Sequence, residues 1–191
     1  MKTGFALLLT KVKQVLEEIE EAAKHSFLPI VGPVKGKILA RTISDASPHL
    51  VLEVGTLIGY SAILMGKELD RNAEIITIEI HPEEAKEAEM NIKRAEIAPK
   101  VTVLVGDAIK IIPTLKDCYD AVFIDAEKSE YYTYLRLMEN KLDKGAVIVA
   151  DNAGIFAEQM QNYLEYVRKS GNYQSRYVPV GNDGLEISIK L

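Results

Sequence analysis

The sequence predicts an α/β fold in which a doubly wound, mostly parallel sheet of seven strands carries helices on both faces. Three observations favour this fold. Short apolar runs rich in β-branched residues alternate with helical patterns along most of the chain. A glycine-rich turn follows the first of these runs, and the chain ends in two strand-like runs around a polar turn. Together they indicate a Rossmann-like sheet that ends in an antiparallel hairpin.

The elements follow in a regular order. Apolar residues recur at helical spacing over 5–23, and a second helix is predicted over 34–44, after a break marked by Pro29, Gly32 and Pro33. Strands are expected at 50–54, 74–79, 101–105, 120–124, 145–150, 174–180 and 185–190, and helices at about 60–70, 82–97, 109–116, 129–142 and 156–169. The turn Gly181–Gly184 should join the last two strands as a four-residue loop.

Length and composition fit one globular domain over residues 1–191, with residues 1–45 covering the active site and 46–191 forming the core. The net charge of −5 gives no basic surface for nucleic acid, so a small-molecule substrate is favoured. The single cysteine, Cys118, excludes an intrachain disulfide and suits the cytoplasm, and we interpret it as a buried structural thiol. The apolar start is too short to span a membrane and lacks a cleavage site. A homodimer is left open.

Two apolar runs that stop at carboxylates carry the most functional information. The run 121–124 ends at Asp125, with Lys128 three residues further on, and the run 147–150 ends at Asp151 and Asn152. Because parallel strands deliver their carboxyl ends to one edge of the sheet, these side chains should meet there. Two carboxylates and an amide oxygen suit Mg²⁺, with Mn²⁺ or Ca²⁺ as alternatives. Lys128 would lie beside that cation as a base. The alternative for Lys128 is a solvated surface lysine, and the alternative for Asp151 and Asn152 is a helix cap.

The turn after the first strand predicts a site for a nucleoside. Gly55 and Gly59 let a ligand approach the backbone, and Ser61 offers a hydroxyl at the start of the next helix. The spacing Gly-x-x-x-Gly does not match the dinucleotide fingerprint, so a smaller anionic group is favoured over a pyrophosphate. Glu79 ends the second strand, where it can accept hydrogen bonds from ribose hydroxyls, and Asp107 ends the third, beside an expected adenine. Considered alone, the two glycines could simply form a tight turn, Glu79 could be a solvated charge at the end of a strand, and Asp107 could cap the following helix.

These motifs resemble the class I S-adenosylmethionine-dependent methyltransferases, and more narrowly the cation-dependent O-methyltransferases that include catechol and caffeoyl-CoA O-methyltransferases. The segments that carry the resemblance are 31–38, 52–61, 76–79, 105–108, 123–128, 150–152 and 183–186. The resemblance implies that S-adenosylmethionine is bound by Val31, Glu53, Gly55, Thr56, Gly59, Ser61, Glu79, Ile80, Asp107, Ala108 and Asp125. It implies that Mg²⁺ is bound by Asp125, Asp151 and Asn152, and that Lys128 is the catalytic base.

Two departures from the family concern the substrate. The N-terminal segment is short, and the chain has no tryptophan with which to build the aromatic walls of some catechol enzymes. The function predicted first is O-methylation of a small acceptor with two adjacent hydroxyls, with Lys128, Asn152 and Glu186 contacting it. Glu186 matches a glutamate that accepts a hydrogen bond from the unmethylated hydroxyl in the catechol enzymes. The alternative for Glu186 is an outward-facing charge on an edge strand.

Three other functions remain as hypotheses at this stage. A tRNA hydroxyuridine O-methyltransferase would show a basic patch near the metal, and the acidic balance of the chain counts against it. A caffeoyl-CoA-type enzyme would take a CoA ester, and many such relatives lack an acid at the position of Glu186. A cofactor-binding protein without catalysis is disfavoured by the intact set of Asp125, Lys128, Asp151 and Asn152.

Overall fold

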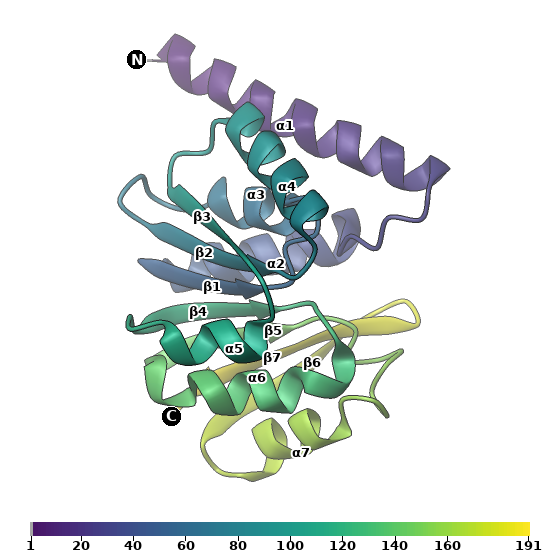
Figure 1. Ribbon diagram of the computed structural model, residues 1–191, viewed down its shortest axis with the longest axis vertical. Helices are drawn as coiled ribbons and strands as arrows, with labels where there is room; N and C mark the ends of the chain where they lie inside the picture. The colour runs from purple at the N-terminus through teal and green to yellow at the C-terminus, as the bar shows by residue number, and fades with distance from the viewer. Residues whose placement is uncertain (1) are drawn as a thin grey trace.

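The chain folds around one seven-stranded sheet with the strand order β3-β2-β1-β4-β5-β7-β6 (Figure 1). The computed structural model describes residues 2–191, and side chains are described from Thr10 onward. The strands are β1 (Leu50–Val54), β2 (Glu74–Glu79), β3 (Lys100–Val105), β4 (Tyr119–Ile124), β5 (Leu142–Ala150), β6 (Tyr173–Val180) and β7 (Asp183–Lys190). The first five strands are parallel to one another, and β7 runs antiparallel to both β5 and β6. The predicted fold class is confirmed.

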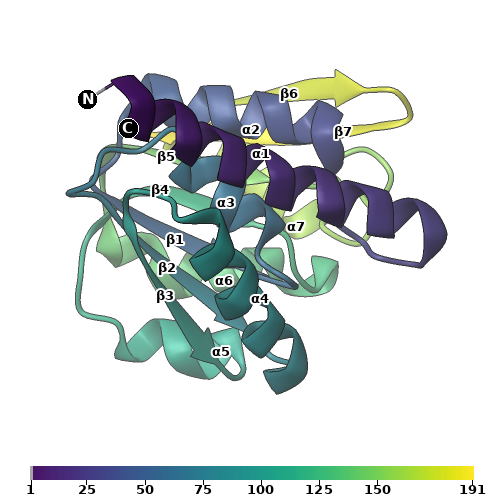
Figure 2. The same cartoon turned by 90° about the horizontal axis from the view of Figure 1, so that it is seen from above.

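Helices cover both faces of the sheet, as Figure 2 shows from above. They are α1 (Lys2–His25), α2 (Gly32–Ala46), α3 (Tyr60–Gly66), α4 (Pro82–Ala95), α5 (Ala108–Ile111), α6 (Tyr131–Met138) and α7 (Gln161–Lys169). Helices α1 to α4 share one core with alternate strand residues such as Phe123 and Val149. Helices α5 to α7 share the other core with the residues between them, such as Val122 and Ile148. Because β4 is buried on both sides, its run 121–124 is entirely apolar.

The strand order reverses between β1 and β4. From β1 the chain first builds outward through β2 and β3, then returns to place β4 on the other side of β1. At such a switch point the loops that follow the two central strands diverge to opposite faces and leave a crevice at their carboxyl ends. Gly55 and Asp125 follow these two strands directly, so both lie at the crevice.

The N-terminal part packs across one face through α1 and α2. The hydroxyl of Tyr60 donates a hydrogen bond of 2.5 Å to Glu20 on α1, and ion pairs join Arg94 to Glu18 and Lys11 to Glu96. The predicted apolar positions of α1 before Thr10 lie outside the described side chains. Among the helices that the structure describes, none combines the length and apolar character that a bilayer crossing requires.

Element ends differ from expectation where proline or glycine acts locally. Helix α2 begins at Gly32, because a proline in the first turn loses no hydrogen bond there. Helix α5 stops at Ile111 and gives way to a 3₁₀ turn that contains Pro113. The last hairpin has a two-residue loop instead of four, since Val180 pairs with Asp183 and Gly181 has a positive φ of 58°.

The interpretation of Cys118 as a buried thiol is wrong. Cys118 is exposed, because it lies in the polar connection that precedes β4. Burial begins one residue later, at Tyr119, where the strand enters the sheet. The thiol therefore does not belong to the core.

Candidate active site: a cavity beside a carboxylate cluster

A cavity of about 480 Å³ opens at the carboxyl ends of β1, β2, β3 and β4. The predicted cofactor residues among its lining are Val31, Gly55, Thr56, Ser61, Glu79, Ile80, Asp107, Ala108 and Asp125. Residues Pro29 and Ile30, from the segment between α1 and α2, line it as well. The structure thus brings most of the predicted set together. Glu53 and Gly59 are not part of the lining and lie behind it.

The glycine turn after β1 has the shape that its sequence predicts. Gly55 has φ 95°, and a Cβ atom there would lie 2.1 Å from the carbonyl oxygen of Asp125. Gly59 has φ 87° and lies against Ala88 of α4, where a Cβ would come within 3.2 Å of the backbone. Only glycine combines this backbone conformation with such close packing. The turn can therefore run directly over the end of β4.

Glu79 is fixed at the floor of the cavity by backbone donors. Its Oε2 accepts a hydrogen bond of 2.7 Å from the amide of Leu57, and its Oε1 accepts one of 2.9 Å from the amide of His81. Leu57 has a positive φ of 47°, a conformation that costs free energy in a residue other than glycine. The carboxylate thus holds the turn in shape, and each oxygen keeps a second lone pair for a ligand hydroxyl.

Glu53 lies beneath the turn with no exposed surface. The hydroxyl of Thr77 donates a hydrogen bond of 2.5 Å to Oε2 of Glu53, and a second hydrogen bond joins the hydroxyls of Thr56 and Thr77. Burial raises the pKa of Glu53 to about 7; hydrogen bonds from Ser61 and Thr77 oppose the shift, while the charges of Asp125 and Glu79 add to it. The carboxyl group is therefore close to its protonation midpoint at neutral pH.

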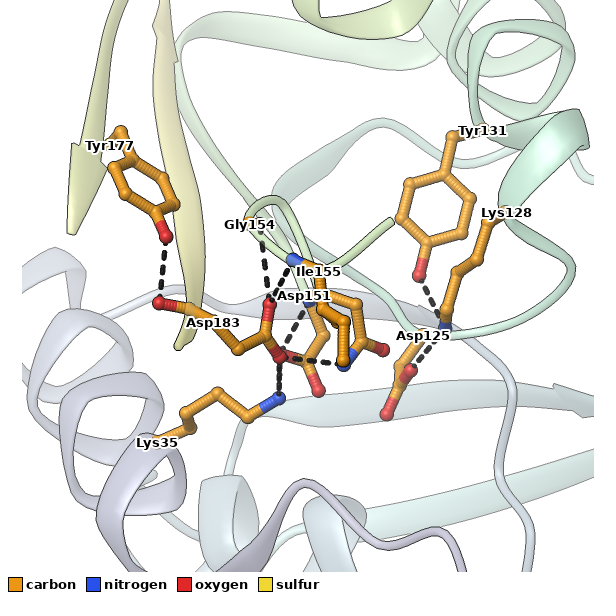
Figure 3. A network of polar contacts seen from close by, with 10 residues as sticks. Lys35, Asp125, Lys128, Tyr131, Asp151, Gly154, Ile155, Tyr177 and Asp183 are labelled. Atoms are coloured by element: carbon orange, nitrogen blue, oxygen red, sulfur yellow. Dashed lines mark hydrogen bonds and ion pairs between the residues drawn. The ribbon is translucent and has the colours of Figure 1, made fainter. Parts of the chain in front are cut away.

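The second part of the site is a cluster of carboxylates at the ends of β4 and β5 (Figure 3). The amide of Asp125 donates to the carbonyl of Val54, and the amide of Asp151 donates to the carbonyl of Ile124. These bonds extend the ladder by one residue and set the two aspartates side by side. Asn152 follows with a left-handed backbone, φ 59°, which asparagine tolerates better than most residues.

Lys128 reaches back to this cluster, as its spacing predicts. Its Nζ donates to Oδ1 of Asp125 at 2.8 Å and to the hydroxyl of Tyr131 at 3.0 Å. Burial, reinforced by the charges of Asp125 and Asp151, raises the pKa of Tyr131 well above its usual value, so this hydroxyl stays protonated. Lys128 is thus held by two fixed partners and is not a solvated surface lysine.

Two further residues of the cluster were not predicted. Lys35 of α2 forms ion pairs with Oδ1 of Asp151 at 2.6 Å and with Oδ2 of Asp183 at 2.8 Å. Asp183, the first residue of β7, also accepts a hydrogen bond of 2.8 Å from the side-chain amide of Asn152. Both residues lie in segments that carry the family resemblance, and that was the only signal in the sequence for a role at the site.

Burial and charge act in opposite directions on these carboxyl groups. Burial and the neighbouring charge of Asp125 raise the pKa of Asp151 to about 6, although Lys35 opposes the shift. Burial would also raise the pKa of Asp183, but hydrogen bonds from Lys35, the Ile155 amide and Asn152 outweigh it and bring that pKa to about 2. The cluster therefore concentrates negative charge that is only partly balanced by lysine.

Glu186 lies in a different environment from the one expected. It has no exposed surface, and it accepts hydrogen bonds from Nε and Nη2 of Arg168, at 2.9 and 2.6 Å, and from Ser175 at 2.7 Å. The alternative of an outward charge on an edge strand is wrong, because β7 lies between β5 and β6 and helices cover both faces. Contact between Glu186 and an acceptor stays a prediction, and the structure directs this carboxylate to Arg168 of α7.

The comparisons with known proteins agree with this geometry. The family model for O-methyltransferases matches residues 9–171. Catechol O-methyltransferase B of Danio rerio is 35% identical over 193 residues, covering 94% of this chain and 72% of the relative. Catechol O-methyltransferase of Mus musculus is 34% identical over 191 residues, covering 93% and 71%. The structure of the O-methyltransferase TomG from Streptomyces achromogenes, in complex with S-adenosylmethionine, superposes with a TM-score of 0.84 at 25% identity, covering 92% and 89%.

The fold and the site thus define an enzyme of the class that transfers a methyl group from S-adenosylmethionine to an oxygen atom. The chain belongs to the O-methyltransferase family.

The buried carboxyl group of Glu53 makes the stability of the protein depend on pH. Between pH 4.5 and about 7 the folded state keeps a proton that the unfolded state releases, so stability should fall as pH rises through this range. In Glu53→Gln the contribution of this carboxyl group should be absent, while that of Asp151 remains in both proteins. Urea unfolding at pH 5 and pH 8 should show that, over this range, the free energy of unfolding of the natural protein falls by on the order of 3 kcal/mol more than that of the variant. Equal changes in the free energy of unfolding of the two proteins would contradict the raised pKa of Glu53.

Proposed function

We propose that this enzyme requires a divalent cation and methylates a small acceptor that carries two adjacent hydroxyls, of the catechol type. The observation that carries the proposal is the double position of Asp125. Asp125 belongs to the lining of the cofactor cavity, and its carboxylate also stands beside Asp151 in the carboxylate cluster. A methyl donor in the cavity and an acceptor at the cluster would therefore be neighbours.

The donor set of the cluster fits a hard cation such as Mg²⁺. Asp125, Asp151 and Asn152 offer two carboxylates and an amide oxygen, the ligand types that Mg²⁺ prefers. Lys128 contacts Oδ1 of Asp125, and Lys35 contacts Oδ1 of Asp151. Lysine ammonium groups pair with both carboxylates, so the site attracts positive charge. The relatives named catechol O-methyltransferase support the same assignment.

The chemistry of methyl transfer then assigns roles to the residues of the chain. A bound divalent cation would lower the pKa of an acceptor hydroxyl and orient two hydroxyls together. Lys128, fixed by Asp125 and Tyr131, places a nitrogen within reach of a hydroxyl at the cluster as a proton acceptor. Glu79 and the glycine turn orient the donor from the other side.

Metal dependence is tested by a methyl-transfer assay with three kinds of acceptor: a free catechol, a hydroxycinnamoyl-CoA ester and undermodified tRNA. We expect transfer to the catechol, its loss after chelation with EDTA, and recovery on addition of Mg²⁺ or Mn²⁺. Binding of S-adenosylmethionine, measured by calorimetry, should survive chelation because most of the cavity lining, including Gly55 and Glu79, takes no part in the carboxylate cluster. Full turnover after exhaustive chelation would contradict the metal assignment, and transfer only to the CoA ester or to tRNA would replace the acceptor class.

The base is tested by Lys128→Met with Lys116→Met, an exposed lysine in the connection before β4, as the matched control. The turnover rate of Lys128→Met should fall by about 10²–10⁴-fold, while cofactor affinity changes little. The deficit should narrow at high pH, where an acceptor hydroxyl ionises without help. A Lys128→Met enzyme with the turnover of the control at neutral pH would show that the cation alone activates the acceptor.

A further inference from the structure

Asp183 gathers donors from two separate parts of the chain, helix α2 and the loop that follows β5. Its Oδ2 accepts hydrogen bonds from Lys35 of α2 and from the side-chain amide of Asn152, both at 2.8 Å. Its Oδ1 accepts from the backbone amides of Gly154 at 3.2 Å and Ile155 at 3.1 Å. Figure 3 shows the carboxylate between Lys35 and the loop that follows β5. A hairpin residue with only a local role would not need partners on α2 and on this loop.

The bond to Asn152 selects which end of that amide can face a cation. The nitrogen of a side-chain amide donates hydrogen bonds, and only its oxygen can ligate a metal. Because Asp183 accepts the hydrogen bond from the nitrogen, the oxygen of Asn152 is left as the free end. A hydrogen bond of this kind fixes the orientation of a ligand and commonly determines metal affinity.

The loop that carries Asn152 is held by the same carboxylate. The amides of Gly154 and Ile155 both point to Oδ1 of Asp183, and the amide of Ala153 donates to the carbonyl of Gly184 at 3.0 Å. A Cβ atom at Gly154 would lie 2.8 Å from the Cα of Asp183, so only glycine permits this approach. The loop and the start of β7 therefore form one unit.

Lys35 ties this unit to the N-terminal part of the chain. Its ammonium lies 2.6 Å from Asp151 and 2.8 Å from Asp183, and only 14% of its side chain is exposed. Helix α2 holds the lysine in place because Gly36 packs against Leu64 of α3, where a Cβ would come within 2.6 Å. The ammonium group of Lys35 therefore balances the charge of Asp183 from a fixed position on α2.

We propose that Asp183 is the positioning residue of the divalent-cation site: it orients the amide of Asn152 and anchors the loop 153–155, with Lys35 as its counterion. This assignment rests on the proposed metal dependence and deepens it. It places a residue of the last hairpin and a residue of α2 in the support of a site whose ligands come from β4 and β5.

The test measures Mn²⁺ affinity directly, by electron paramagnetic resonance of the free ion, in Asp183→Asn and Asp183→Glu. The first variant removes the charge and keeps the shape, and the second keeps the charge and displaces the carboxylate by one methylene. Both should bind Mn²⁺ about 10–100-fold more weakly than the natural protein. Affinity for S-adenosylmethionine should be unchanged in both, since Asp183 is not in the lining of the cavity. Asp45→Asn, an exposed aspartate on α2, serves as the control.

The outcomes separate the proposal from its alternatives. Natural affinity in Asp183→Glu would show that charge alone matters, and natural affinity in both variants would leave Asp183 a hairpin residue; either result overturns the proposal. Equal losses of Mn²⁺ and S-adenosylmethionine binding would indicate a general structural role and overturn it too. A natural protein that binds no Mn²⁺ would remove the metal dependence itself, which is a different failure.

A measurement on the natural protein covers the case in which the variants do not fold. Hydrogen exchange at the amides of Gly154 and Ile155 reports whether Oδ1 of Asp183 holds the loop. Saturation with Mg²⁺ should slow exchange at both amides by about tenfold or more, because a cation that holds Asn152 stabilises the loop bonded to Asp183. Unchanged exchange at saturating Mg²⁺ would overturn the proposal.

Discussion

The close approach of Gly55 to Asp125 is the contact on which the rest of the site depends. A side chain at position 55 would overlap the carbonyl of Asp125, so the turn after β1 passes directly over the end of β4 only because it begins with glycine. This crossing joins two environments: the cavity walled by the ends of β1, β2 and β3, and the carboxylates at the ends of β4 and β5. In the proposed function, the methyl donor and the acceptor would share Asp125 as a common boundary.

The cluster is organised by charge as much as by topology. Three aspartates, Asp125, Asp151 and Asp183, face two lysines, Lys35 and Lys128, so the group has more negative than positive charge. Lys128 pairs with Asp125, and Lys35 pairs with both Asp151 and Asp183, so the two ammonium groups reduce the repulsion among the carboxylates. An excess of buried negative charge is costly unless a cation joins it. A divalent ion therefore suits the site electrostatically as well as by ligand type.

The features that could be predicted from the sequence are those that depend on residues close together in the chain. The apolar runs before Asp125 and Asp151 are local patterns, and they predict both strands and the aspartate that follows each of them. The glycine turn and Glu79 were likewise placed by neighbouring residues. Asp183 and Lys35 acquire their roles only from contacts across the fold, some 148 positions apart in the chain, which no local pattern encodes. Glu186 is a buried carboxylate, and its partner Arg168 lies on a helix whose packing the sequence does not specify.

The most direct test of this account is a crystal structure of the protein with Mn²⁺ and S-adenosylmethionine, with the metal located by its anomalous scattering. The account predicts one strong anomalous peak, ligated by Asp125, Asp151 and the side-chain oxygen of Asn152, with the cofactor in the cavity beside it. In the same crystal structure, the side-chain nitrogen of Asn152 should still donate a hydrogen bond to Asp183. A peak at other residues, or a cofactor-bound site that excludes the metal at saturating Mn²⁺, would contradict the account.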